Sequence, residues 1–364
     1  MKYELANPKP NALIESLRAF GYNLKTAIAD IIDNSITAES TEIHIKFNWE
    51  AKKSWIAIVD NGKGMSEKKL QNAMILGSEN PLLEREEKDL GRFGLGLKTA
   101  SFSQCRLLSV ITKQNNSQSC RVWDLDYVGK TNEWRLLTDL KLETKQIFNK
   151  IDFFDKGTIV IWEKLDNIIS DLDNCDLSKE IFYEKISEIE NHLSMTFHRL
   201  LNKHKIFINN KKIKPWDPFL EKEIAHRQIF EEKILHKNFK YNVISHILPH
   251  YSKISKKSHD YGAGIRGWND HQGFYVYRKK RLIMAGSWLN LNIKKEEHYK
   301  LARILIDIPS NADKDWLIDV KKSSIKPPDI IKKDLKRIAN ITRKQACEVY
   351  RHKGKVITRK SIGN

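Results

Sequence analysis

The sequence has few cysteines and no long apolar run. Its 364 residues include four scattered cysteines (Cys105, Cys120, Cys175 and Cys347), which have neither the close spacing of a zinc site nor the density of a disulfide scaffold. No stretch approaches the roughly 18 consecutive apolar residues that span a membrane, and the N-terminal MKYELANPKP lacks the apolar segment of a signal peptide. These absences predict a soluble, cytoplasmic protein without a structural metal bound by cysteine.

Acidic residues are scarce in the C-terminal part. Residues 1–200 carry 27 Lys and Arg against 30 Asp and Glu, whereas residues 201–364 carry 37 against 16. The whole net charge of +18 therefore arises after residue 200. Such a one-sided surplus favours contact with a polyanion such as nucleic acid. The alternative is a lysine-rich surface that reflects an AT-rich genome.

Apolar periodicity predicts alternating helices and strands followed by a basic helix. The polar segment 77–92 is too long for a tight connection and is predicted to be a functional lid or disordered. From residue 329 onward the pattern is helical, with 11 Lys and Arg against 3 acidic residues. The predicted helices are 13–20, 26–37, 66–76 and 180–201, and the predicted strands are 41–47, 55–59, 106–112, 119–126, 157–163, 206–208 and 302–308, with a hairpin over 273–286.

Glycine is also scarce, yet six of the 16 glycines fall between Gly62 and Gly96. In the cluster DNGKGM (60–65), Asp60 ends an apolar strand. Its carboxylate can accept a hydrogen bond from an exocyclic amine there, while the glycines leave room for a flat ring. The cluster GRFGLG (91–96) opens a helix, LKTASFSQ, whose first amides can bind an anion. Either cluster alone is more often a simple turn.

The helix over 26–37 carries polar groups on one flank. Asp30, Asp33 and Asn34 have the spacing i, i+3, i+4, which places them on one face. Such a flank is usually only solvated, but an amide four residues after a carboxylate can hold a divalent cation while the carboxylate orients a water. Further along, Gly157 and Thr158 enter a strand, where an ordinary β-threonine is the alternative.

The order of these four elements resembles that of the GHKL ATPases (gyrase, Hsp90, histidine kinases and MutL) over about the first 165 residues. The resemblance implies a Bergerat-type α/β sandwich that binds ATP and Mg²⁺. By this resemblance Asn34 would coordinate Mg²⁺, and Asp60 would accept from the adenine amino group. The other positions implied are Gly62, Gly64 and Met65 along the base, Gly91, Gly94, Leu95, Gly96, Leu97, Lys98 and Thr99 around the phosphates, and Thr158 at the adenine.

Within this superfamily the chain is similar to MORC-type proteins, particularly prokaryotic ones. The segments that carry this similarity are AIADIIDNSITA (27–38), GRFGLGLKTASFSQ (91–104), INNKKIKPWDP (208–218) and GFYVYRKKRLIMAG (273–286). The resemblance implies an ATP-binding domain over 1–170 with its lid at 77–97, a connecting helix and S5-like transducer domain over 171–328, and a basic helical tail over 329–364. A transducer lysine would reach the γ-phosphate; Lys326 in IDVKKSSIKPP (318–328) is the candidate, with Lys322 as its rival.

One position departs from the family pattern, because Asp30 stands where a general-base glutamate is usual. A side chain shorter by one methylene favours slow ATP hydrolysis over the alternative of a nucleotide switch with little hydrolysis. The predicted function is an ATP-gated homodimeric clamp on DNA, with a role in DNA restriction or defence suggested by association. An Hsp90-like chaperone or protein scaffold is the rival, and the abrupt end at RKSIGN suggests a fragment of a longer protein.

Overall fold

The computed structural model describes residues 4, 8–19, 21–77, 96–169, 175–309, 312–313, 315–317 and 325–351. The chain divides into two compact units, unit 1 (Met1–Pro215) and unit 2 (Trp216–Asn364). Within the described ranges, no helix combines the length and the apolar character that a membrane crossing requires.

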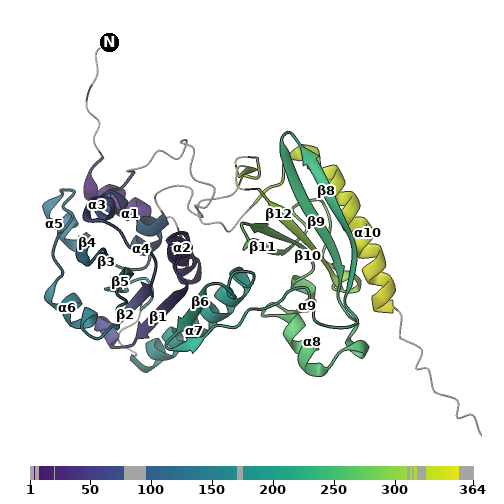
Figure 1. The fold of residues 1–364 in the computed structure, drawn as a ribbon, viewed down its shortest axis with the longest axis horizontal. Helices are drawn as coiled ribbons and strands as arrows, with labels where there is room; N and C mark the ends of the chain where they lie inside the picture. The colour runs from purple at the N-terminus through teal and green to yellow at the C-terminus, as the bar shows by residue number, and fades with distance from the viewer. Residues whose placement is uncertain are drawn as a thin grey trace, which may run out of the picture. The chain divides into compact units, whose positions relative to one another are not determined.

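Unit 1 is built on a seven-stranded sheet (Figure 1). Its strand order is β4-β3-β5-β2-β1-β6-β7, and all neighbours are antiparallel except β1 and β6. Every residue of the central strand β2 is buried, so its sequence WIAIVD is apolar without alternation until the final aspartate. The strands are β1 (Glu42–Asn48), β2 (Trp55–Asp60), β3 (Leu107–Gln114), β4 (Ser117–Asp124), β5 (Gly157–Glu163), β6 (Lys205–Ile208) and β7 (Lys211–Lys212).

Helices bury both faces of this sheet. The larger core joins Ile56, Ile58 and Trp162 to helices that include α2, α4 and α7. The smaller core lies on the opposite face of the sheet, where Ala57, Ile159 and their neighbours pack against the α6 region. The helices of unit 1 are α1 (Pro10–Arg18), α2 (Leu24–Thr37), α3 (Glu67–Met74), α4 (Gly96–Phe102), α5 (Leu125–Thr131), α6 (Leu142–Phe148) and α7 (Cys175–Thr196), with a 3-10 turn η1 (Ala51–Lys53).

The division between the units differs from the boundary expected after residue 170. Strand β6 lies within the 171–328 range expected for the second domain, but it extends the first sheet by pairing in parallel with β1, from Glu42↔Lys205 to Ile45↔Ile208. Helix α7 packs against α2, and its Phe182, Leu193 and other apolar residues belong to the core of unit 1. Strand β6 runs in the same direction as β5, the strand before it in the chain, and α7 forms the long crossover that such a connection requires.

Unit 2 has a five-stranded sheet with the order β11-β10-β12-β9-β8. The hairpin expected over 273–286 is present, whereas the β8–β9 hairpin was not foreseen from the sequence. The elements are β8 (Arg227–His236), β9 (Phe239–Ile247), β10 (Gly273–Arg278), β11 (Arg281–Ser287), β12 (Ala302–Ile308), α8 (Lys256–Ala263), α9 (Gly267–Asp270), α10 (Lys332–Arg351), η2 (Tyr251–Lys253), η3 (Glu297–Tyr299) and η5 (Asp329–Ile331).

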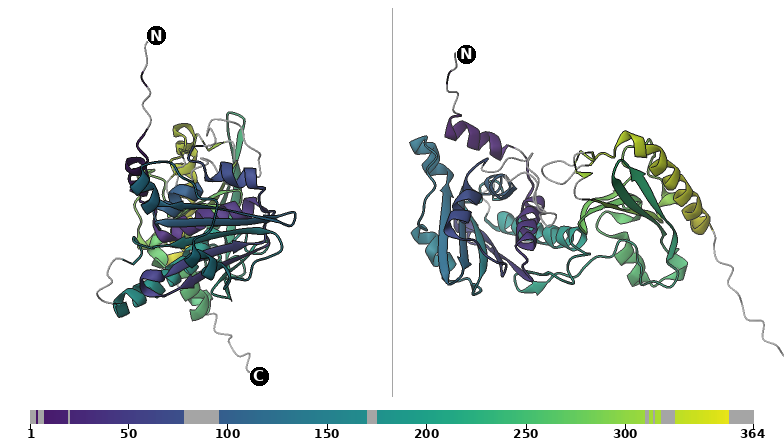
Figure 2. Two further views of the ribbon diagram at one scale, coloured as in Figure 1. Left: turned by 90° about the vertical axis from the view of Figure 1, so that its left-hand side faces the viewer. Right: turned by 45° about the horizontal axis from the view of Figure 1, so that its top comes forward.

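Helix α10 was expected to form a separate basic tail, but it is part of this unit. Figures 1 and 2 show it lying along the sheet, and it packs on β9 and β12. Its residues Leu335, Ile338 and Ala346 are buried in the core of unit 2. An apolar stripe along the helix explains this docking.

Candidate functional site

The first element of the candidate site is a carboxylate at the end of β2. Asp60 is only 5% exposed; its Oδ1 accepts a hydrogen bond from the Gly62 amide (2.8 Å), and its Oδ2 accepts one from the Ser35 hydroxyl (2.8 Å). Burial raises the pKa of Asp60, although hydrogen bonds from the Gly62 amide, the Ser35 hydroxyl and the Thr158 backbone lower it in part. The result is a buried carboxylate whose protein hydrogen bonds come from neutral donors.

The loop after Asp60 is packed against the ends of β3 and β5. Gly64 has φ +63°, and a Cβ on it would lie 2.0 Å from the Lys113 carbonyl oxygen, so only glycine fits there. The Met65 amide donates to Thr112 Oγ1 (2.9 Å), which in turn donates to the Gly157 carbonyl (3.0 Å). Thr158 lies opposite Asp60 in the β2–β5 register. Five predicted positions, Asp60, Gly62, Gly64, Met65 and Thr158, are thus brought together.

The second element is helix α2, which begins at an N-cap where Asn23 accepts from the Thr26 amide (3.0 Å). Asp30 is buried, and its Oδ2 accepts a hydrogen bond from the Tyr22 hydroxyl (2.9 Å). Asn34, one turn later, is exposed. A Cβ built on Gly96 would lie 3.9 Å from Asp30 Oδ2, so the first residue of α4 lies beside this carboxylate.

Helix α4 presents its predicted phosphate-binding residues unequally. Leu97 is half-buried and Thr99 is buried. Lys98, expected at the phosphates, is also buried, and its Nζ donates to the carbonyls of Ala73 (2.8 Å) and Ile75 (2.9 Å). The ammonium therefore caps the C-terminal end of α3, where the helix dipole favours a cation.

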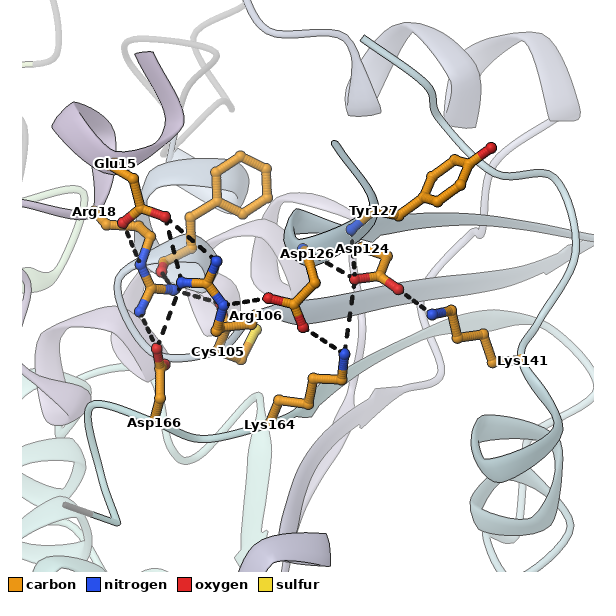
Figure 3. Close-up of polar contacts among 11 residues, drawn as sticks. Glu15, Arg18, Cys105, Arg106, Asp124, Asp126, Tyr127, Lys141, Lys164 and Asp166 are labelled. Carbon is orange, nitrogen blue, oxygen red and sulfur yellow. Dashed lines mark hydrogen bonds and ion pairs between the residues drawn. The ribbon is translucent and has the colours of Figure 1, made fainter. Parts of the chain in front are cut away.

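A network of charged residues anchors the far end of α4 (Figure 3). The buried Arg18 donates to the carbonyls of Phe102 (2.7 Å) and Cys105 (3.0 Å) and pairs with Asp166 (2.6 Å). Arg106 continues the network to Asp126 (2.6 Å). The helix that begins beside Asp30 is thus held at its other end by α1.

The same network ties β4 and α5 to the strand end of β5. Lys164 pairs with Asp126 (2.6 Å), and Lys141 pairs with the buried Asp124, which also caps α5. Burial opposes ionisation of Asp126, but hydrogen bonds from Lys164 and Arg106 lower its pKa overall. This carboxylate is therefore charged at neutral pH and holds two cations in place.

Several predicted residues are not placed in this site. Gly91, Gly94, Leu95 and Lys322 lie outside the described residues. Lys326 lies in unit 2, where its side chain is exposed. Its contact with a nucleotide in unit 1 stays a prediction.

Three residues that support the site were missed by sequence reasoning. Ser35 follows Asn34 directly, and its place on the buried side of α2 was the available signal. Tyr22 precedes Asp30 by eight residues and stands before the helix begins, so no periodicity connects them. Thr112 meets the DNGKGM loop only through the pairing of β3 with β5, which no local pattern reveals.

The mixed sheet and the helices on its two faces form an α/β layered fold, with a buried carboxylate at the end of β2. Residues 22–158 match the family model described as histidine kinase-, DNA gyrase B-, and HSP90-like ATPase. The resemblance of this segment to GHKL ATPases is therefore confirmed. The chain is also 29% identical over 90 residues to the ATPase morc-1 of Caenorhabditis elegans, a stretch that covers 25% of this chain and 10% of that protein.

Proposed function

We propose that this chain is an ATPase that binds Mg–ATP in unit 1 and works as an ATP-gated dimeric clamp on DNA. The observation that carries the ATP-binding part is the buried Asp60 at the end of β2, with its neutral donors and the packed glycine loop beside it. An anionic acceptor in such a site suits an exocyclic amine, because hydrogen bonds to a charged group are strong when water is excluded. The match to the ATPase family supports the same assignment.

The residues of α2 fit a magnesium ion that is shared with the substrate. Among the residues that the structure describes, no group of three or more His, Cys, Asp or Glu could hold a metal. Mg²⁺ commonly binds through one or two protein oxygens together with substrate phosphates. The exposed amide of Asn34, one turn after the Asp30 carboxylate, offers such an oxygen. When bound, the ion would neutralise phosphate charge.

Asp30 would orient and deprotonate the attacking water. The Tyr22 hydroxyl fixes Oδ2 of this carboxylate, and the start of α4 lies beside it. The short side chain favours slow turnover, because a general base must come within about 3 Å of the water or act through one more water. A nucleotide switch with little hydrolysis is the second candidate function, and the aspartate at this position is the observation that favours it.

The clamp would close when a transducer lysine, Lys326 or Lys322, contacts the γ-phosphate of the bound nucleotide. The lid expected over 77–97 lies mostly outside the described residues. The excess of basic residues after residue 200 supports DNA as the substance held. An Hsp90-like scaffold that meets acidic proteins is the rival. A restriction or defence role stays a prediction from the resemblance.

Two measurements test this proposal. Asp30→Asn should abolish ATP turnover and spare ATP binding; turnover at the wild-type rate would refute the role of Asp30. Sedimentation of the full chain with Mg²⁺ and ATP, a non-hydrolysable ATP analogue or ADP should give a dimer with the triphosphates only. A monomer under all conditions, with nucleotide bound, would favour the switch over the clamp.

A further inference from the structure

Helix α10 carries four basic side chains that make no hydrogen bond or ion pair with any other described residue: Lys333, Lys336, Lys344 and Arg351. All four are exposed. The helix's other cations are engaged. Lys332 pairs with Asp329 (2.5 Å) and Arg337 with Glu232, while Arg343 stacks over Tyr299, with 3.8 Å from its guanidinium carbon to the ring centroid.

The four free cations form one stripe along the helix. At 3.6 residues per turn they fall within about 80° of one another around the helix axis. Their common direction is opposite the buried residues Leu335, Thr342 and Ala346, which face the sheet of unit 2. The stripe is about 27 Å long from Lys333 to Arg351 at 1.5 Å per residue. We call these four residues the α10 stripe.

The surroundings of the α10 stripe favour a polyanion over a membrane. An interfacial membrane helix needs an exposed apolar face beside its basic one. In α10 the apolar face is buried against β9 and β12, and Ile341 (38% exposed) is its single exposed large hydrophobic residue among those described. Two acidic residues lie on the described helix: Glu348, between Lys344 and Arg351, is exposed, and Asp334 is partly exposed and pairs with Arg337 (3.7 Å).

We infer that the α10 stripe is the surface through which this protein binds the phosphate backbone of duplex DNA. A straight row of cations about 27 Å long matches a duplex, which carries about one charge per 1.7 Å of its axis. Contacts of this kind position the protein without reading sequence. The inference rests on the proposed function for the nature of the partner, and it adds where on the chain that partner lies.

The test measures the salt dependence of binding. The full-length chain, without nucleotide, is titrated with a fluorescent random-sequence duplex across a range of NaCl concentrations. Each phosphate contact contributes about 0.9 to the slope of log K against log salt, so replacing all four stripe residues by Gln should reduce that slope by about 3 to 4. The matched control replaces four exposed lysines elsewhere in unit 2, Lys222, Lys240, Lys253 and Lys257, by Gln and should change the slope by less than about 1.

A charge-retaining variant separates charge from lysine chemistry: Lys333→Arg, Lys336→Arg and Lys344→Arg together should keep the wild-type slope. An unchanged slope in the stripe variant would overturn the inference and leave DNA as the partner. Equal losses in the stripe and control variants would also overturn it, since binding would then be diffuse. If the wild type does not bind DNA at low salt, the inference is refuted and DNA is no longer the partner in the proposed function. The ATPase part of that function is tested separately, by measuring ATP turnover.

Discussion

Replacing Asp60 by Asn should separate the stability of unit 1 from its ability to bind ATP. The side chain keeps its shape, and its remaining oxygen can still accept from the Gly62 amide. The new amide can donate to the Ser35 hydroxyl, which exchanges its role as donor for that of acceptor. Because a buried charge disappears, we expect the free energy of unfolding to stay equal or to rise by about 1 kcal/mol at neutral pH.

ATP binding should respond in the opposite direction. A hydrogen bond to a charged acceptor is worth about 1.5 to 3 kcal/mol, so the Kd for ATP should rise about 10- to 100-fold. The affinity is measured by calorimetric titration and the stability by thermal unfolding of the same samples. Ser35→Ala is the contrasting variant. It leaves the Asp60 charge with one donor fewer and should lower stability by about 1 to 3 kcal/mol.

The pH dependence gives a further check. Burial raises the pKa of Asp60 above the ordinary 3.8, so the folded wild type regains stability as acidification protonates this group. The advantage of Asp60→Asn should therefore be largest near neutral pH and shrink toward about pH 4. Wild-type ATP affinity in Asp60→Asn, or a large loss of its stability at neutral pH, would refute the reasoning.

Three further perturbations test other parts of unit 1. Tyr22→Phe removes the hydroxyl that orients the candidate base and should lower kcat about 10-fold with ATP affinity unchanged; a change in affinity alone would contradict a positioning role. Gly64→Ala should cost at least about 3 kcal/mol in urea unfolding, because the added Cβ collides with backbone, whereas Gly77→Ala, with a similar φ and open space, should cost about 1 kcal/mol. Arg18→Met should cost about 2 to 4 kcal/mol by leaving buried carbonyls unpaired, and the exposed Arg135→Met less than about 0.5 kcal/mol; equal effects would show that the network does not stabilise the fold.

The sequence predicted the elements whose pattern is local. Strand 302–308, the 273–286 hairpin and the start of the 66–76 helix, where Ser66 is the N-cap, appear at or near the expected residues. Alternation, turn residues and capping chemistry operate over a few positions. Strand β8 was missed since it lies at the edge of its sheet, with Ile234 as its one buried residue, and so lacks an apolar alternation.

Side-chain direction was harder to predict than position. The family resemblance placed Lys98 at the phosphates, yet its Nζ donates to the carbonyls of Ala73 and Ile75 at the end of α3. Strand β6 was recognised as a strand, but its assignment to a sheet depends on the return of α7 across unit 1. Both outcomes depend on contacts between residues far apart in the sequence.

The parallel pairing of β6 with β1 also has a mechanical consequence. A pulling force applied to the chain at Pro215 first reaches the last two strands of unit 1, β7 and β6. Because β6 also pairs with β1, this force can pass into the sheet without passing along α7. The β1–β6 ladder, from Glu42↔Lys205 to Ile45↔Ile208, then transmits this load to the rest of the sheet. From β1 the load passes to β2, where Ile43 stands opposite Asp60. Asp60 therefore lies two strand ladders away from the point at which the chain leaves unit 1.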